Sequence, residues 1–215
     1  MLRLIIGNKN YSSWSLRGWL PLKHLGIAFE EERIALFAPG YKQRILAHSP
    51  GGKVPCLIDG AVVVWESVAI GEYLAEKFPA LGLWPSDPAR RALARSISAE
   101  MHAGFTALRS AMPMNIRSSH PGKGRSPEVD ADIGRVTAIW DECLQRSGGP
   151  FLFGEFTFAD AMYAPVATRF ITYAVALDSG ARRYAEHLWN LPAMLEWRAA
   201  SERETEFLAE DEPYR

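Results

Sequence analysis

KVPCLIDGAVVVWESVAIGEYLAE, residues 53–76, contains a proline turn, a β-hairpin and the beginning of a helix in immediate succession. Residues 56–58 and 62–65 are short apolar runs, and the Asp-Gly pair at 59–60 between them is a strong hairpin signal. Pro55 cannot donate to a sheet ladder, so it must stand at the start of the first strand, where its X-Pro bond is a candidate for the cis form. This placement leaves the backbone of Val54 unpaired.

Glu66 and Ser67 follow the second strand and open an apolar helix, whose first N–H groups need an acceptor. A helix N-terminus attracts a carboxylate, a glutamate attracts an ammonium group, and a free extended backbone such as that of Val54 can pair with a peptide. Together these groups suit a zwitterionic peptide ligand. The alternative is that Glu66 and Ser67 only cap the helix and that Pro55 only ends a loop.

Length and composition exclude several classes of protein. A chain of 215 residues forms one large or two small domains, and its net charge of −1 gives no electrostatic reason to expect nucleic acid or an anionic membrane as a partner. The two cysteines, Cys56 and Cys143, are far apart and without a CxxC motif, which predicts neither a disulfide framework nor a metal site. No secretory signal and no run of ~18 apolar residues is present, so a soluble cytoplasmic protein is expected.

The residues before this segment predict an alternation of strands and helices. Residues 2–6 are an apolar run that predicts a buried strand, and a helix should then begin at Ser12 or Ser13 as N-cap and end at Gly26, with a kink or break at Pro21. Residues 29–36 predict a second strand, parallel to the first because a helix connects them. Residues 37–48 predict a loop with a short helix, which completes the order βαβαββα.

The rest of the chain predicts only helices. A proline- and glycine-rich segment separates the two parts, so we expect domains at residues 1–78 and 90–215 joined by a linker at 79–89. Apolar spacing predicts helices over residues 90–111 and 129–144. Thr157 and Asp160 form a carboxylate version of a capping box, which predicts a helix start with a structural role. The acidic end, residues 202–215, is expected to fray.

Three sequence features in this order resemble the glutathione S-transferase family: SSWSLR at residues 12–17, Lys53-Val54-Pro55, and Glu66-Ser67. The resemblance covers nearly the whole chain. It implies a thioredoxin-like N-terminal domain that binds glutathione, an all-helical C-terminal domain that supplies the second-substrate pocket, and a homodimer. Glutathione would be the co-substrate, and no metal is expected.

The resemblance also implies roles for individual residues. Ser67 and its backbone would hold the γ-glutamyl carboxylate of glutathione, and Glu66 would assist at the same end. The backbone of Val54 would pair with the cysteinyl unit. Lys53 and Lys42 would face the glycyl carboxylate, although Lys42 also fits an ordinary solvated surface lysine.

Thiol activation would fall to a serine at the start of the first helix. In serine-type members the active hydroxyl lies five residues before an arginine, and Ser12 has that relation to Arg17. A hydroxyl that donates to a thiolate lowers the thiol pKa from its ordinary value of ~8.5, and the helix N-terminus acts in the same direction. Ser13 is the alternate, Tyr11 is a rival donor, and Ser12 acting only as a cap is the structural alternative.

The Ser12-Ser13 pair resembles the zeta class, whose members isomerise maleylacetoacetate or dehalogenate small haloacids. Arg169 then looks like a second-substrate residue that binds a carboxylate, although a structural ion pair is an alternative for it. The zeta pattern has Cys where Trp14 stands and commonly Gln where Lys53 stands, so the class is open. We predict a transferase that attacks a small electrophile; the alternatives are a zeta-like isomerase and a non-catalytic glutathione-binding module.

Overall fold

The computed structural model describes residues 1–214, and its N-terminal part is organised around a four-stranded sheet in the order β2-β1-β3-β4. The strands are β1 (Leu2–Ile6), β2 (Phe29–Arg33), β3 (Cys56–Asp59) and β4 (Val62–Trp65). β1 pairs parallel with β2 and antiparallel with β3, and β3 and β4 form the predicted hairpin. The second strand ends at Arg33, three residues short of the prediction.

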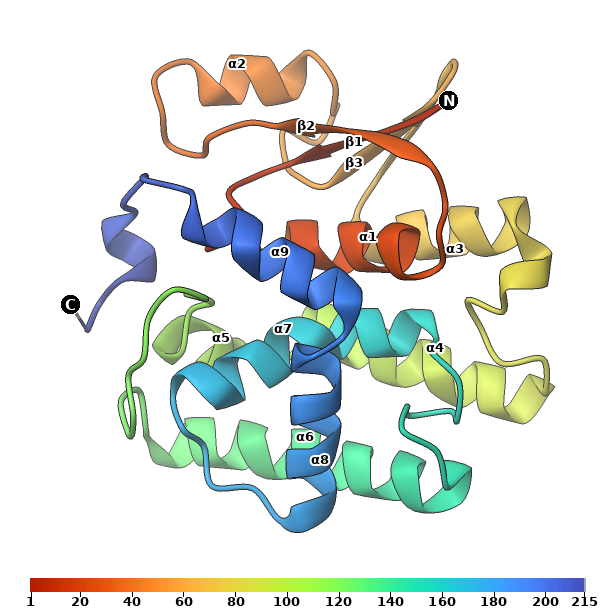
Figure 1. Ribbon diagram of the computed structural model, residues 1–215, viewed down its shortest axis with the longest axis vertical. Helices are drawn as coiled ribbons and strands as arrows, with labels where there is room; N and C mark the ends of the chain where they lie inside the picture. Colours follow the sequence, from red (N-terminus) through yellow and green to blue (C-terminus); the bar gives the residue numbers. More distant parts are fainter. Residues whose placement is uncertain (215) are drawn as a thin grey trace.

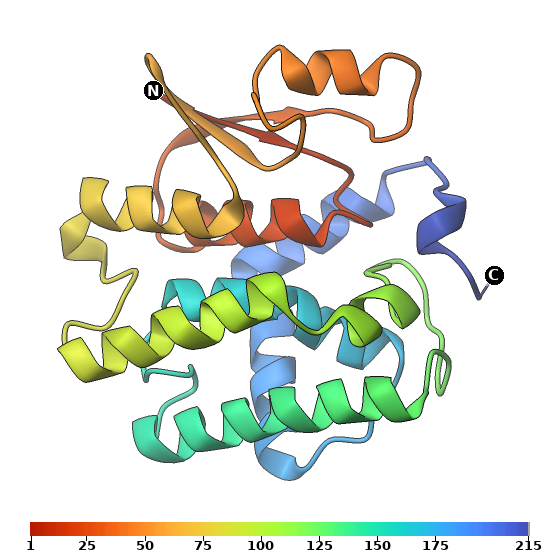
Figure 2. The same ribbon diagram turned by 180° about the vertical axis from the view of Figure 1, so that it is seen from behind.

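The side chains of β1 point alternately to the two faces of the sheet, and each face is covered by different helices. Leu2, Leu4 and Ile6 belong to the main core, on the face covered by α1 (Ser13–His24) and α3 (Ser67–Lys77). Ile5 points the other way and packs with Ile45 of α2 (Tyr41–Leu46) in a small second core. Figures 1 and 2 show α2 on one side of the sheet and α1 and α3 on the other. The observed order βαβαββα confirms the predicted thioredoxin-like fold.

The C-terminal part is helical, as predicted, and α7 lies at its centre (Figure 1). Nearly every side chain of α7 is buried, because the helix packs against α1, α4 and α8. The helices are α4 (Pro88–Ala103), α5 (Thr106–Ala111), α6 (Pro127–Ser147), α7 (Phe158–Thr172), α8 (Ser179–Trp189) and α9 (Pro192–Glu202), with the short 3₁₀ turns η1 (Pro79–Leu81) and η2 (Ala209–Asp211). None of the helices in residues 1–214 combines the length and apolar character needed to cross a bilayer.

Two helix predictions differ from the structure. The single helix expected over residues 90–111 is two helices, α4 and α5, separated at Gly104 and Phe105, where Phe105 has a left-handed φ of 57°. Apolar spacing continues across this break, so periodicity could not reveal it. Of the kink or break expected at Pro21, the break is absent: α1 runs on through Pro21 to His24, although the proline removes one intrahelical N–H donor. The helix then ends before Gly26, as predicted.

The capping box at the start of α7 is present and buried. The Asp160 carboxylate accepts hydrogen bonds from the Thr157 N–H at 2.8 Å and the Thr157 hydroxyl at 3.0 Å, and also from the Leu152 N–H and the Tyr184 hydroxyl. Burial nevertheless raises the pKa of Asp160 to about 6. The box therefore connects α7, α8 and the loop before α7, as expected of a structural element.

Up to residue 214, the acidic end of the chain is anchored rather than frayed; residue 215 of that prediction lies outside the described residues. Glu204 is buried, and its carboxylate accepts hydrogen bonds from the backbone N–H groups of Lys9 at 2.7 Å and Asn10 at 3.0 Å. The Tyr214 hydroxyl donates to the Ala111 carbonyl at 2.7 Å. The segment thus packs against the loop before α1 and against α5, near the C-terminus marked in Figures 1 and 2. The domain boundaries at 78 and 90 remain a prediction.

Candidate active site

Two adjoining cavities share Ser12 and Trp14 at the N-terminus of α1. The first, here called the proline chamber, has a volume of about 410 Å³ and is lined by Ser12, Trp14, Leu36, Tyr41, Ile45, Gly52, Lys53, Val54, Pro55, Glu66, Ser67 and His102. The second, the arginine chamber, has a volume of about 360 Å³ and is lined by Tyr11, Ser12, Ser13, Trp14, Leu36, Thr106, Arg109, Ser110, Pro113, Met114, Arg169 and Asp211. Both lie between the sheet-containing part and the helical part.

Ser12 is the N-cap of α1. Its hydroxyl oxygen accepts a hydrogen bond from the Ser15 N–H at 3.3 Å, and its hydroxyl donates to the Ser15 Oγ at 2.7 Å. Ser15 Oγ also accepts from the Gly7 N–H at 2.9 Å, so the three groups form a short chain of hydrogen bonds. Ser13 is the first helical residue, and its hydroxyl has no hydrogen-bond partner among the described residues. The cap is therefore Ser12, and assigning it to Ser13 would be wrong.

The turn before β3 offers a free backbone to the proline chamber. The Val54-Pro55 peptide bond is cis, as the sequence suggested. Within residues 1–214, neither the N–H nor the carbonyl of Val54 takes part in a hydrogen bond. Lys53 lines the same chamber.

The N-terminus of α3 is open toward the proline chamber. Glu66 precedes the helix with a left-handed φ of 68°, and its side chain does not cap the helix. Ser67 is almost completely buried and lines the chamber beside Glu66. The first-turn N–H groups of α3 therefore have no side-chain acceptor, and the reading of Glu66 as a simple cap does not hold.

His102 of α4 reaches the same helix start, a contact that no sequence pattern indicated. Its Nδ1 lies 3.5 Å from the Ser67 hydroxyl, and its Nε2 lies 3.5 Å from a Glu66 carboxylate oxygen. Its ring also meets the Trp14 ring edge-on, with centroids 5.1 Å apart. Burial lowers the pKa of His102, and the Glu66 carboxylate partly opposes this effect. His102 is thus a contribution of the helical part to the proline chamber.

Three arginines without a carboxylate ion pair in residues 1–214 lie near this site: Arg17 and Arg109, which contact Trp14, and Arg169, which lines the arginine chamber. The Trp14 ring lies 4.6 Å from the Arg17 guanidinium and 5.3 Å from that of Arg109. Arg17 is fully buried, its Nε donates to the Met162 carbonyl, and neither Nη finds a partner within the described chain. Arg169 is 4% exposed and donates through Nε and Nη1 to the carbonyls of Met112 and Pro165. Burial lowers the pKa of all three arginines, that of Arg169 to about 10.

None of these arginines forms an ion pair with a carboxylate in the described part of the chain. At neutral pH Arg169 is cationic, because its pKa stays well above 7. Buried charges without a partner are costly, and an anionic ligand in the arginine chamber would reduce that cost. The chamber is therefore suited to a small molecule that carries a carboxylate.

The structure brings most of the predicted site residues together. Ser12, Lys53, Val54, Glu66 and Ser67 line the proline chamber, whereas Ser13 and Arg169 line the arginine chamber. Lys42 is exposed on α2 and lines neither cavity; its neighbour Tyr41 lines the proline chamber instead. A role for Lys42 remains a prediction.

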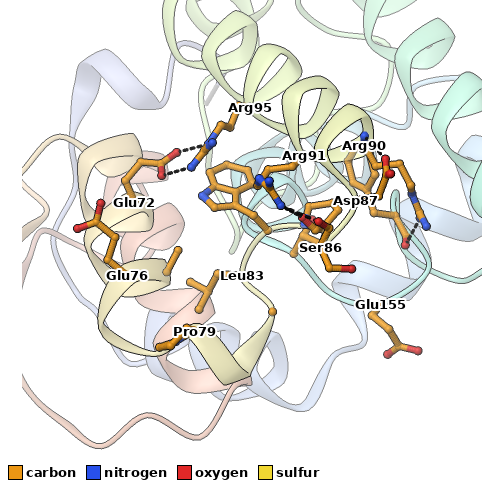
Figure 3. Close-up of a pocket in the computed structure, with 16 residues that line it drawn as sticks. Glu72, Glu76, Pro79, Leu83, Ser86, Asp87, Arg90, Arg91, Arg95 and Glu155 are labelled. Carbon is orange, nitrogen blue, oxygen red and sulfur yellow. Dashed lines mark hydrogen bonds and ion pairs between the residues drawn. The ribbon is translucent and has the colours of Figure 1, made fainter.

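Other cavities lie away from this site. One, of about 530 Å³, lies between α3, the segment 79–87 and the start of α4 (Figure 3). Its arginines are already occupied: Arg95 pairs with Glu72 at 2.7 Å, and Arg91 donates to the Ser86 carbonyl. Another, of about 990 Å³, lies between α6 and α8. No group of three or more potential metal ligands occurs within residues 1–214.

A thioredoxin-like domain that is followed by a helical domain, with a polar cavity at the cis-proline turn, defines a class of glutathione-dependent proteins. The family model for the N-terminal domain of glutathione S-transferase matches residues 11–77, and the model for the C-terminal domain matches residues 125–202. The chain belongs to the glutathione S-transferase family.

Individual relatives agree with this assignment. A probable maleylacetoacetate isomerase from Caenorhabditis elegans is 30% identical over 155 residues, which is 72% of each chain. Glutathione S-transferase 1 from Dianthus caryophyllus is 40% identical over 163 residues, 74% of this chain and 73% of the relative. A glutathione transferase homologue from Burkholderia, solved with bound glutathione, has the same fold, with a TM-score of 0.73, 23% identity, and coverage of 94% of this chain and 99% of that one.

Proposed function

We propose that the protein binds glutathione in the proline chamber and activates its thiol for attack on a small, carboxylate-bearing electrophile in the arginine chamber. The observation that carries this proposal is that both cavities meet at Ser12, which lines each of them. A thiolate held beside Ser12 would have a second substrate within reach in the neighbouring cavity. Such placement is a large part of what an enzyme contributes to a bimolecular reaction.

The proposed roles of the glutathione-binding residues follow from what each offers. Ser67 and the uncapped N–H groups of α3 suit the γ-glutamyl carboxylate, and the Glu66 carboxylate suits the γ-glutamyl ammonium group. The unpaired backbone of Val54 suits the cysteinyl unit, in the manner of an added strand. Lys53 suits the glycyl carboxylate, and we propose Lys42 as a weaker, solvent-exposed partner for the same group.

Ser12 is the proposed donor to the thiolate. Its hydroxyl hydrogen now points to Ser15 Oγ, so donation to sulfur requires that the hydroxyl turn. Ser15 can compensate, because its own hydroxyl can then donate to Ser12 Oγ while the Gly7 N–H continues to donate to Ser15. The N-terminus of α1 adds a favourable potential for the negative sulfur.

A zeta-like isomerase is the second candidate. Its support is the relative named as a probable maleylacetoacetate isomerase. In that reaction the thiolate adds to the substrate and later leaves, so glutathione is regenerated. In conjugation it is consumed. A glutathione-binding module without catalysis is the third possibility.

One assay distinguishes the three. The protein is incubated with glutathione and a panel of haloacids, maleyl compounds and uncharged electrophiles, while substrate and free thiol are both followed. We expect loss of substrate and of thiol together for a transferase, and loss of substrate at constant thiol for an isomerase. Neither loss, with glutathione binding intact, would reject an enzymatic function. Ser12→Ala serves as the control for catalysis by this site.

A further inference from the structure

Asp211 comes from the C-terminal segment and lines the arginine chamber. The segment that carries it is firmly held: the Tyr11 hydroxyl bonds to the Glu212 carboxylate, and Arg117 donates through Nη2 to the Glu206 carbonyl at 2.9 Å. The Glu204 carboxylate fixes the same segment to the loop before α1. Asp211 is therefore a built part of the chamber wall.

The three charged groups of the chamber do not neutralise one another by direct contact. Asp211 is half-buried, and its carboxylate accepts no hydrogen bond and forms no ion pair within residues 1–214. Arg169 keeps Nη2 without a protein partner, and Arg109 uses only Nη1, which donates to the His102 carbonyl at 3.2 Å. With Asp211 ionised, the lining carries two positive charges and one negative charge.

A net charge of one positive unit is matched by a ligand with a single negative charge. A second carboxylate in a cavity of about 360 Å³ would lie close to the Asp211 carboxylate, and like charges at short range repel. We propose that Asp211 makes the chamber selective for monocarboxylate electrophiles over dicarboxylates. This inference rests on the proposed use of the arginine chamber for the second substrate, and it narrows the substrate class.

The ionisation of Asp211 adds a second consequence. Burial raises its pKa to about 6; Arg169 of α7 opposes the rise, and the neighbouring Glu210 and Glu212 add to it. As the pH falls below about 6, Asp211 becomes neutral and the net charge of the chamber rises from one to two positive units. The discrimination against dicarboxylates should therefore weaken at low pH, and the part of this weakening that is due to Asp211, beyond the dicarboxylate's own protonation, should be absent once Asp211 is replaced by asparagine.

The test compares butyrate with succinate, which share a four-carbon chain and differ by one carboxylate. Their dissociation constants are measured by titration calorimetry with the full-length, glutathione-saturated protein, for wild type, Asp211→Asn and Glu210→Gln. Glu210 is exposed on the same segment and is absent from the chamber wall. Glu210→Gln removes one negative charge, as Asp211→Asn does, and is therefore a charge-matched control. We expect Asp211→Asn to shift the ratio of affinities roughly tenfold toward succinate, a factor that corresponds to ~1.4 kcal/mol. Glu210→Gln should leave the ratio of the two affinities within about twofold of the wild-type ratio.

An unchanged ratio in Asp211→Asn, or an equal shift in Glu210→Gln, would overturn the proposal, and so would failure of both acids to bind. A parallel kinetic measurement follows chloride release from 2-chlorobutyrate and 2-chlorosuccinate. In this reaction the glutathione thiolate forms a C–S bond while the C–Cl bond breaks and chloride leaves with the electron pair. A shifted binding ratio without chloride release would support the role of Asp211 and count against the proposed transferase. Chloride release with an unshifted binding ratio would support the proposed transferase and count against the role of Asp211.

Discussion

Replacing Ser12 by alanine should affect stability and catalysis by separable amounts. The hydroxyl caps α1 through the Ser15 N–H at 3.3 Å, and loss of such a cap costs about 1 kcal/mol of unfolding free energy. In the proposed mechanism the same hydroxyl donates to the thiolate, and a hydrogen bond to a charged group contributes ~1.5–3 kcal/mol. At ~1.4 kcal/mol per pKa unit, the pKa of bound glutathione should rise by about one to two units.

The absorbance of enzyme-bound thiolate in the ultraviolet, titrated against pH, measures that shift directly. We expect turnover at neutral pH to fall about 10- to 100-fold in Ser12→Ala, with much smaller weakening of glutathione binding and partial recovery at higher pH. Ser13→Ala is the matched control, because Ser13 does not cap α1; its stability should change by less than about 0.5 kcal/mol. An unshifted titration in Ser12→Ala together with a shifted one in Ser13→Ala would refute the assignment and give the role to Ser13.

Three further outcomes are expected. His102→Gln should weaken glutathione binding about fivefold, since it disturbs the contacts to Glu66 and Ser67, whereas His187→Gln on α8 should not; equal dissociation constants in calorimetry would contradict this. Asp160 has a folded-state pKa of about 6 against 3.8 unfolded, so the folded protein binds more protons in this window and ~3 kcal/mol of stability should be lost as the pH rises from about 4 to 6. When the free energy of unfolding is measured by urea titration at several pH values, it should change less between about pH 4 and 6 in Asp160→Asn than in wild type. An identical pH dependence in the two proteins would rule the effect out. Sedimentation should show a homodimer of twice the 24.0 kDa chain; a monomer alone at micromolar concentration would exclude it.

The sequence predicted those parts of the fold that depend on neighbouring residues. Asp59-Gly60 lies between two apolar runs, so the hairpin follows from a local turn; in the structure Asp59 pairs with Val62, and Gly60 and Ala61 form the turn. Pro55 excludes itself from the ladder, which predicted the free Val54 backbone. The parallel pairing of β1 and β2 followed from the helix between them. The capping box of Asp160 was likewise visible as a four-residue pattern.

The missed parts depend on residues that are distant in the sequence. His102 meets Ser67 across 35 positions, and a single histidine on an amphipathic helix carries no signal of that contact. The acidic end looked suited to solvent, yet Glu204 finds two buried N–H donors near the start of the chain. Asp211 could be placed in a cavity only after this anchoring was known. The split between α4 and α5 arises at Gly104, where an added Cβ would lie 2.8 Å from the Glu100 carbonyl oxygen.

Trp14 lines both cavities, and its contacts influence the electrostatic potential in each of them. The guanidinium groups of Arg17 and Arg109 and the ring of His102 contact its ring, so Trp14 brings two cations, from α1 and α5, onto one aromatic surface. Cation–π contact stabilises these groups without neutralising them, unlike a carboxylate partner. Their positive potential therefore remains available near Ser12, where it would favour a thiolate on one side of the ring and a substrate carboxylate on the other. A cysteine at position 14, as in the zeta pattern, would offer no such surface, which gives a physical reason to expect a substrate preference different from that class.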